Sequence, residues 1–233
     1  MENYYYLGLL VITLAYPLLQ SFERRIQYYK KWYALGPAVF IPAALYIYWD
    51  HWFTAIGVWG FNPRYVIGIY LFGLPMEEIM FFFIVPFACV FIYEVMIYFV
   101  KRDILRPFAH FFVYLTAPLF FILGTIHIDK LYTAINFLLT GIILLIHFII
   151  FKNKYLGRFL LGYFVTLIPF MLVNGILTGS FLDEPIVIYN DSENLSLRVG
   201  TVPIEDSVYL LGLLLLNITI YEKIKSLKTI QSS

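Results

Sequence analysis

The stretch "GLPMEEIMFFFIVPF", residues 73–87, places two adjacent carboxylates, Glu77 and Glu78, at the start of a long uncharged run. Charged side chains are costly within a bilayer, so acids at the edge of an apolar run indicate a functional site. A proline followed by acids is also an ordinary helix start, because carboxylates are stabilised at the positive end of the helix dipole. This stretch alone leaves both interpretations open.

A second copy of the pattern lies near the C-terminus. The stretch "VPIEDSVYLLGLLLLNITIYE", residues 202–222, repeats the order proline, any residue, acid, acid, and later Tyr-Glu. The spacing also repeats, because Pro75 and Tyr93 are 18 positions apart, as are Pro203 and Tyr221. Duplication at matched spacing weakens the helix-start interpretation. We therefore predict that four carboxylates are catalytic and share one site: Glu77, Glu78, Glu205 and Asp206.

Composition places the whole chain in a membrane. Hydrophobic residues make up 61% and charged residues 13%, whereas about a quarter of the residues of a soluble domain are charged. Membrane spans need roughly 20 apolar residues. Seven such runs predict an all-α integral membrane protein with seven transmembrane helices, at about 3–20, 32–49, 68–99, 108–126, 131–151, 156–178 and 202–222.

The repeat divides these helices into two units. Residues 1–105 are expected to form a first three-helix repeat, 106–128 a linking helix and 129–233 a second three-helix repeat, all within one membrane domain. One linking helix gives both units the same orientation, which is a parallel repeat about an axis along the membrane normal. The two acid pairs would then lie at the same depth.

The distribution of basic residues predicts the topology. Thirteen of the 16 Lys and Arg residues fall on one side of the expected spans, and only Arg64, Lys130 and Arg198 fall on the other. Positive residues are enriched in cytoplasmic loops. We therefore expect a protein of the cytoplasmic membrane with its N-terminus outside and its C-terminus in the cytoplasm.

Other polar residues and motifs narrow the chemistry. Glu94 and Glu222, at the far ends of the same helices, are expected to form ion pairs, and His147 is expected either to pack with a hydrogen bond or to serve a site. The histidines lack a metal-ligand spacing, the single Cys89 allows no intrachain disulfide, and nucleotide- and flavin-binding motifs are absent. We expect no cofactor, no metal and no nucleic-acid partner.

The motifs resemble a known family. The stretches "PLLQSFERR", "GVWGFNPRYVIGIYLFGLPMEE", the downstream "YE" and "TVPIEDSVYLL" are similar to the membrane-embedded lycopene cyclases of the heterodimeric type, here with both repeats in one chain. The chain departs from an exact repeat at Asp206, which is one methylene shorter than Glu78.

The resemblance implies an isomerase, an intramolecular lyase, that converts the open ψ-ends of lycopene to β-ionone rings, giving γ-carotene and then β-carotene. An acid would protonate the terminal alkene and a base would remove a proton from the cyclised cation, with no redox cofactor. The expected partners are lycopene or a similar apolar polyene, the lipid bilayer and other enzymes of carotenoid biosynthesis. We expect substrate contacts from Trp59, Asn62, Pro75, Phe81, Phe82, Pro203 and Tyr209.

Two other functions use the same features. A membrane terpene or meroterpenoid cyclase would apply the same acid-initiated chemistry to another prenyl substrate. A proton-coupled small-molecule transporter would also combine parallel repeats with buried carboxylates. Such transporters bind substrate near the midplane, whereas the paired acids here lie near one face.

Overall fold

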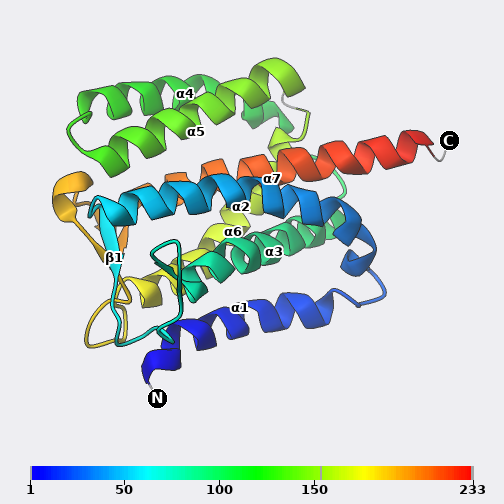
Figure 1. The fold of residues 1–233 in the computed structure, drawn as a ribbon. Coiled ribbons are helices and arrows are strands. Elements are labelled where there is room, and N and C mark those ends of the chain that lie inside the picture. The colour runs from blue at the N-terminus through cyan, green and yellow to red at the C-terminus, as the bar shows by residue number, and fades with distance from the viewer. Residues whose placement is uncertain (1, 153, 232–233) are drawn as a thin grey trace.

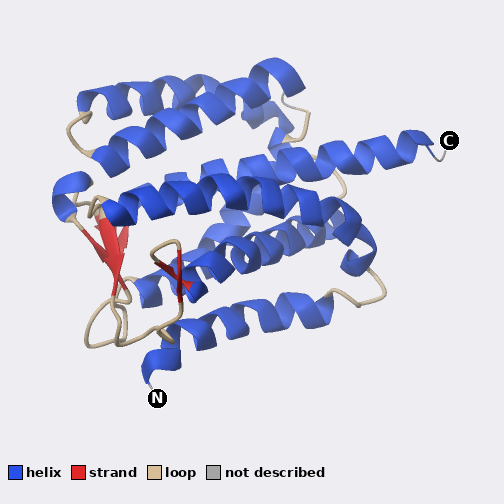
Figure 2. Ribbon diagram, in the orientation of Figure 1, coloured by secondary structure: helices blue, strands red, loops and turns tan. Residues whose placement is uncertain are grey.

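The computed structural model describes residues 2–152 and 154–231, which form a bundle of helices with short strands at one end (Figures 1 and 2). The α-helices of these residues are α1 (Tyr5–Gln20), α2 (Trp32–Ala55), α3 (Met76–Phe99), α4 (Arg106–Ile126), α5 (Leu131–Phe151), α6 (Leu156–Leu177) and α7 (Ile204–Gln231). Their 3-10 helices are η1 (Glu2–Tyr4), η2 (Tyr28–Lys31) and η3 (Asp191–Glu193). Their strands are β1 (Trp59–Phe61), β2 (Tyr70–Leu71), β3 (Leu74–Pro75), β4 (Val187–Tyr189), β5 (Arg198–Val199) and β6 (Val202–Pro203).

Five helices have the length and composition of membrane spans. By length and composition, α3, α4, α5, α6 and α7 are each long and apolar enough to cross a membrane. The helix α1 has only 16 residues, and α2 carries Asp50 and several polar aromatic residues within its 24. Seven helices are present among the described residues, but membrane spanning by all seven stays a prediction.

The chain is mostly helical, as expected, but the span expected at 68–99 was partly wrong. Residues before Met76 form the hairpin β2–β3 rather than helix, although they are apolar. Gly68 and Gly73 have φ values of +83° and +75°, a region that glycine adopts without strain. Pro75 then precedes the first helical residue. A matching hairpin, β5–β6, precedes α7 and ends at Pro203.

The internal repeat is visible in the packing. Helix α1 packs on α3 as α5 packs on α7, and each unit reaches into the other through α2 on α7 and α6 on α3. The strands β1 and β4, which are equivalent in the repeat, pair antiparallel, with Gly60 opposite Ile188. Such self-complementary pairing is what a two-fold relation between the repeats produces. Helix α4 lies outside this arrangement, against α5 and α6 (Figure 1).

Candidate active site

A small cavity lies where α2, α3, α6 and α7 meet the strands. Its volume is about 50 Å³. Carboxylates from three helices line it, together with aromatic, amide and aliphatic side chains. The lining residues are Tyr6, Asp50, Trp59, Phe61, Glu78, Phe81, Phe82, Val85, Tyr132, Phe170, Asn174, Leu177, Val187, Tyr189, Asp206, Tyr209, Leu210 and Leu213.

The hairpins deliver the paired acids to this place. Each hairpin ends at a proline, and both acids follow in the first turn of α3 or α7. Backbone N–H groups in a first helical turn lack partners within the helix, and the helix dipole favours negative charge there. All four acids are buried. The local sequence thus places two acids at the cavity end of each of two equivalent helices.

The first acid of each pair holds the chain that precedes its hairpin. Glu77 Oε1 accepts the backbone N–H of Ile67 at 2.7 Å, and Glu205 Oε1 accepts that of Leu195 at the same distance. The hydroxyl of Thr133 also donates to Glu205 Oε1 at 2.7 Å. Neither glutamate lines the cavity. These contacts fix the loop geometry around the site.

The second acid of each pair faces the cavity and accepts from tyrosines. The Tyr6 hydroxyl donates to Glu78 Oε2 at 2.6 Å, and the Tyr132 hydroxyl donates to Asp206 Oδ1. Tyr6 and Tyr132 come from the first helix of each repeat, so this contact is duplicated too. The structure therefore brings Glu78 and Asp206 together and keeps Glu77 and Glu205 behind them.

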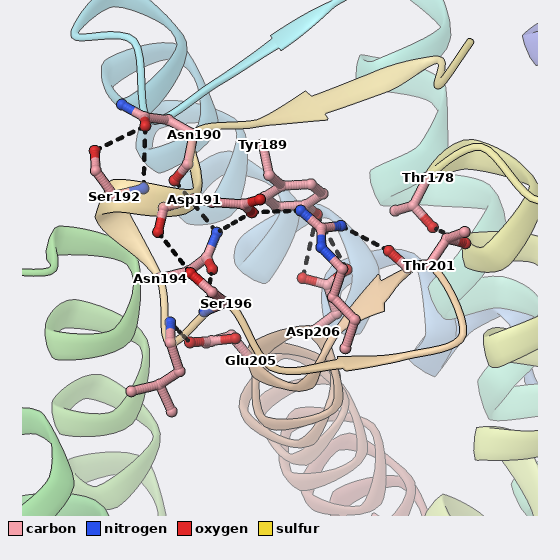
Figure 3. A network of polar contacts seen from close by, with 12 residues as sticks. Thr178, Tyr189, Asn190, Asp191, Ser192, Asn194, Ser196, Thr201, Glu205 and Asp206 are labelled. Atoms are coloured by element: carbon pink, nitrogen blue, oxygen red, sulfur yellow. Dashed lines mark hydrogen bonds and ion pairs between the residues drawn. The ribbon is translucent and has the colours of Figure 1, made fainter.

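Asp206 accepts two additional donors. Asn174 Nδ2 donates to Oδ2 at 2.5 Å, and the Tyr189 hydroxyl lies 3.1 Å from both carboxylate oxygens. Figure 3 shows Tyr189 joined to Asp206 while Glu205 contacts the loop before α7. Burial raises the pKa of Tyr189 well above its ordinary value, and Asp206 raises this pKa further. Tyr189 is therefore a neutral hydrogen-bond donor.

A third carboxylate, Asp50 of α2, also lines the cavity. It is only 2% exposed, and its Oδ1 accepts the indole N–H of Trp59 at 2.5 Å. Its Oδ2 is buried and has no hydrogen-bond partner among residues 2–152 and 154–231. Asp50 was missed from the sequence. As the single charged residue between Lys31 and Arg64, it was an available signal.

Aromatic rings form much of the remaining wall. The Trp59 and Tyr132 ring centroids are 5.1 Å apart with nearly perpendicular planes, and Tyr209 lies 4.9 Å from both Trp49 and Tyr46. Aromatic faces attract cations. The wall can therefore stabilise a positively charged species in contact with it.

Of the seven residues that we expected to bind substrate, four line the cavity and three do not. Trp59, Phe81, Phe82 and Tyr209 line the cavity. The remaining three are buried elsewhere, with Pro75 and Pro203 at the hairpin ends. Asn62 donates from Nδ2 to Glu184 at 2.8 Å and accepts the Arg64 backbone N–H, so it organises a loop.

The polar residues at the opposite end of α3 and α7 have a structural arrangement. Glu94 pairs with Lys31 and Lys225, and Glu222 pairs with Lys225, which confirms the expected ion pairs. Buried His147 bonds through Nδ1 to the Thr219 hydroxyl at 3.0 Å and does not line the cavity. Its packing role is the one that the structure supports.

The fold and the site together define a repeated helical membrane protein with carboxylates of both repeats in one aromatic cavity. A lycopene cyclase family model matches the chain twice, over residues 3–96 and 129–224. These matches cover well over half of the chain, so it belongs to the lycopene cyclase family, whose members act in carotenoid biosynthesis. No curated protein and no solved structure matches the chain.

Proposed function

We propose that this chain cyclises the ψ-ends of lycopene to β-ionone rings by a redox-neutral, proton-initiated reaction. The observation that carries the proposal is that Glu78 and Asp206, from equivalent positions of two repeats, line the same aromatic cavity. One carboxyl group can give a proton and the other can take one, which is the equipment of general acid–base catalysis. Membership in the lycopene cyclase family supports the substrate class.

The reaction balances without a second reactant. A carboxylic acid protonates C2 of the terminal alkene, which leaves a cation at C1. The C5=C6 double bond attacks C1, so that a C1–C6 bond forms and the positive charge moves to C5. Loss of the C6 proton to a carboxylate restores the C5=C6 double bond and gives the β ring. Each passing cation can gain about 0.5–2 kcal/mol from an aromatic face.

Hydrogen bonds distinguish the two acids. Asp206 accepts from Tyr132, Tyr189 and Asn174, which occupy both of its oxygens and suit an ionised carboxylate. Glu78 accepts from Tyr6 at Oε2, and no described residue donates to its Oε1. We therefore assign Glu78 as the proton donor and Asp206 as the base. Asp50, with an unpartnered Oδ2, is the reserve candidate for the donor.

The predicted catalytic roles of Glu77 and Glu205 become positioning roles in this proposal. Their contacts to the backbone of Ile67 and Leu195 hold the loops that carry the acids. An amide oxygen can accept the same N–H bonds. We expect Glu77→Gln to keep activity within about tenfold of the wild type, because one neutral hydrogen bond contributes roughly 0.5–1.5 kcal/mol.

Expression in a lycopene-accumulating host, followed by chromatography of the pigments, tests the function. The wild type should convert lycopene to products with β rings. Glu78→Gln and Asp206→Asn should each lower the rate by about 10²–10⁴-fold, the range expected for loss of a general acid or base. Glu222→Gln, at the other end of the same helix as Asp206, is the control and should retain activity.

The outcomes separate the alternatives. Unchanged lycopene in cells that contain folded wild-type protein would contradict the proposal and favour another prenyl substrate. Half of the activity in each acid variant would indicate two independent sites. Full activity in both Glu78→Gln and Asp206→Asn would show that these carboxylates are not catalytic.

A further inference from the structure

An apolar groove opens beside the carboxylate cavity, between α1, α3 and α6. Its volume is about 380 Å³, and its walls are almost entirely hydrocarbon, including Leu9, Ile12, Ala88, Ile92 and Val173. Ile12 is 73% exposed, so the groove faces the surface that lipid would cover. The groove has the character of a site for an apolar chain.

The groove adjoins the carboxylate cavity. Val85 and Phe170 line both, so these two side chains stand between the two spaces. In the other direction, a hollow of about 370 Å³ shares Tyr16, Phe91 and Ile92 with the groove. The three spaces therefore form one series along α3, with Glu78 in the first and Phe99 in the last.

The series is long enough for an extended polyene. From Glu78 to Phe99, α3 rises about 30 Å at about 1.5 Å per residue. This length is close to the bilayer's hydrocarbon core of roughly 30 Å. A linear hydrocarbon lying in the groove can thus keep one end at the carboxylates, while its far end reaches the last hollow, which Gln20, Glu23 and Arg25 also line.

The matching interface in the second repeat is tightly packed around Gly212. There, α5 and α7 meet α2, and an added Cβ on Gly212 of α7 would lie 2.7 Å from Thr140 Oγ1 and 3.0 Å from the Tyr46 hydroxyl oxygen. The two repeats thus share one cavity but differ in how the helices beside it pack. A chain that reaches the acids through the described groove comes from the first-repeat side.

Resting on the proposed cyclase function, we propose that the groove of α1, α3 and α6 binds the polyene body of the substrate while its ψ-end passes Val85 and Phe170 to reach Glu78 and Asp206. A hydrocarbon without a head group suits this path, because its end can enter a cavity of about 50 Å³ walled by aromatic rings. The polar head of a phospholipid cannot enter there without losing its hydration. Entry is lateral, from the bilayer.

Paired tryptophan substitutions test the groove. Val173→Trp fills it, whereas Leu172→Trp places the same side chain at the neighbouring position of α6, which is 67% exposed and outside the groove. Ile12→Trp and Val11→Trp form a second pair on α1. Each variant is placed in the Glu78→Gln background, so that binding is measured without turnover. The protein is purified from lycopene-accumulating cells, and bound lycopene per chain is quantified.

Groove variants should hold about 5- to 150-fold less lycopene than their paired controls, which corresponds to a steric cost of about 1–3 kcal/mol. Matching melting temperatures within each pair show that the folds are intact. If Val173→Trp and Leu172→Trp bind equal amounts of lycopene, and the two α1 variants also bind equal amounts, the proposal that the groove binds the polyene is wrong. Bound phospholipid in place of lycopene would also overturn it.

Measurements of cyclisation and lycopene binding by the wild-type protein distinguish the groove proposal from the proposed cyclase function. If Glu78-containing wild type cyclises lycopene while the tryptophan pairs bind it equally, the function stands and the groove fails. If wild type binds lycopene in a groove-dependent manner but forms no ring, the groove stands and the cyclase function fails.

Discussion

At the scale of single residues, the site depends on which hydroxyl and amide groups meet each acid. Asp206 and Glu78 occupy equivalent positions, yet Asp206 has three donors and Glu78 has one. The shorter Asp206 side chain is matched by extra donors from α6 and β4, namely Asn174 and Tyr189. Two copies of one motif have thereby acquired different surroundings, which is what separate acid and base roles require.

Tyr132→Phe tests this difference. Loss of the hydroxyl removes one donor to Asp206, and a hydrogen bond to a charged group contributes about 1.5–3 kcal/mol. If the ionised form of Asp206 acts as the base, the turnover rate of purified enzyme should fall about 10- to 100-fold. Tyr6→Phe, which removes the single donor to Glu78, is the matched variant and should have the smaller effect. A larger loss in Tyr6→Phe than in Tyr132→Phe would reverse the assignment.

The sequence was sufficient to find the paired acids but not their partners. The acids were identifiable because the pattern Pro75 to Glu94 is repeated with the same spacing at Pro203 to Glu222. The tyrosine donors to Glu78 and Asp206 lie 72 and 74 positions away along the chain, so only folding brings them together. Asn174 is not part of the repeated pattern. Its contact with Asp206 forms where α6 crosses α7, so the sequence alone does not reveal it.

At the scale of elements, the spacing that α3 and α7 share has a packing explanation. The Tyr221 hydroxyl of α7 donates to Glu94 of α3 at 2.7 Å, and the Tyr93 hydroxyl of α3 donates to Glu222 of α7 at 3.2 Å. Each Tyr-Glu pair therefore bonds to the other across the repeat axis. This reciprocal exchange joins the two helices at the end opposite the carboxylate cavity.

Tyr221→Phe should destabilise the protein without changing its products. Glu94 is 2% exposed and has Lys31 and Lys225 as ion partners, so loss of the tyrosine donor leaves a buried charge with one contact fewer. We expect a loss of about 1–3 kcal/mol in the free energy of unfolding in detergent. Tyr93→Phe should cost less, because its bond is longer and Glu222 is more exposed. Equal stability of all three proteins would contradict this explanation.

The hairpins before α3 and α7 are the elements that the sequence did not predict. Apolar content alone made residues 68–75 look like the beginning of a span, and hydropathy cannot separate a buried hairpin from a helix end. Gly68, Gly73 and Pro75 were the signals for a break, since glycine permits positive φ and proline suits a helix start. The helices α4, α5 and α6 were predicted to within a few residues because uninterrupted apolar runs determine them.

At the scale of the whole molecule, the two-fold relation places both acidic helix starts at one end of the bundle. The pairing of β1 with β4 ties the repeats together at that end, and α7 ends at the opposite end of the bundle (Figure 1). Basic residues gather at the other end, where Lys31 and Lys225 meet Glu94. The carboxylate cavity should therefore lie near the outer face of the membrane.

Cysteine labelling in whole cells measures this orientation. With Cys89 replaced by alanine, a cysteine at exposed Ser192 should react with a membrane-impermeant reagent, and one at Gln27 should react only after the cells are permeabilised. The prediction follows from the excess of basic residues on the Gln27 side. Labelling of Gln27→Cys alone in intact cells would place the cavity near the cytoplasmic face.

The most direct test of the proposed chemistry is cyclisation by purified wild-type protein in deuterated water. Protonation at C2 by an exchangeable carboxyl group predicts one deuterium for each ring formed, located at C2, and no change in the oxidation level of the product. Mass spectrometry and NMR of the isolated pigment measure both the number and the position. Rings that form without deuterium, or that carry it at another carbon, would contradict proton-initiated cyclisation at the Glu78–Asp206 site.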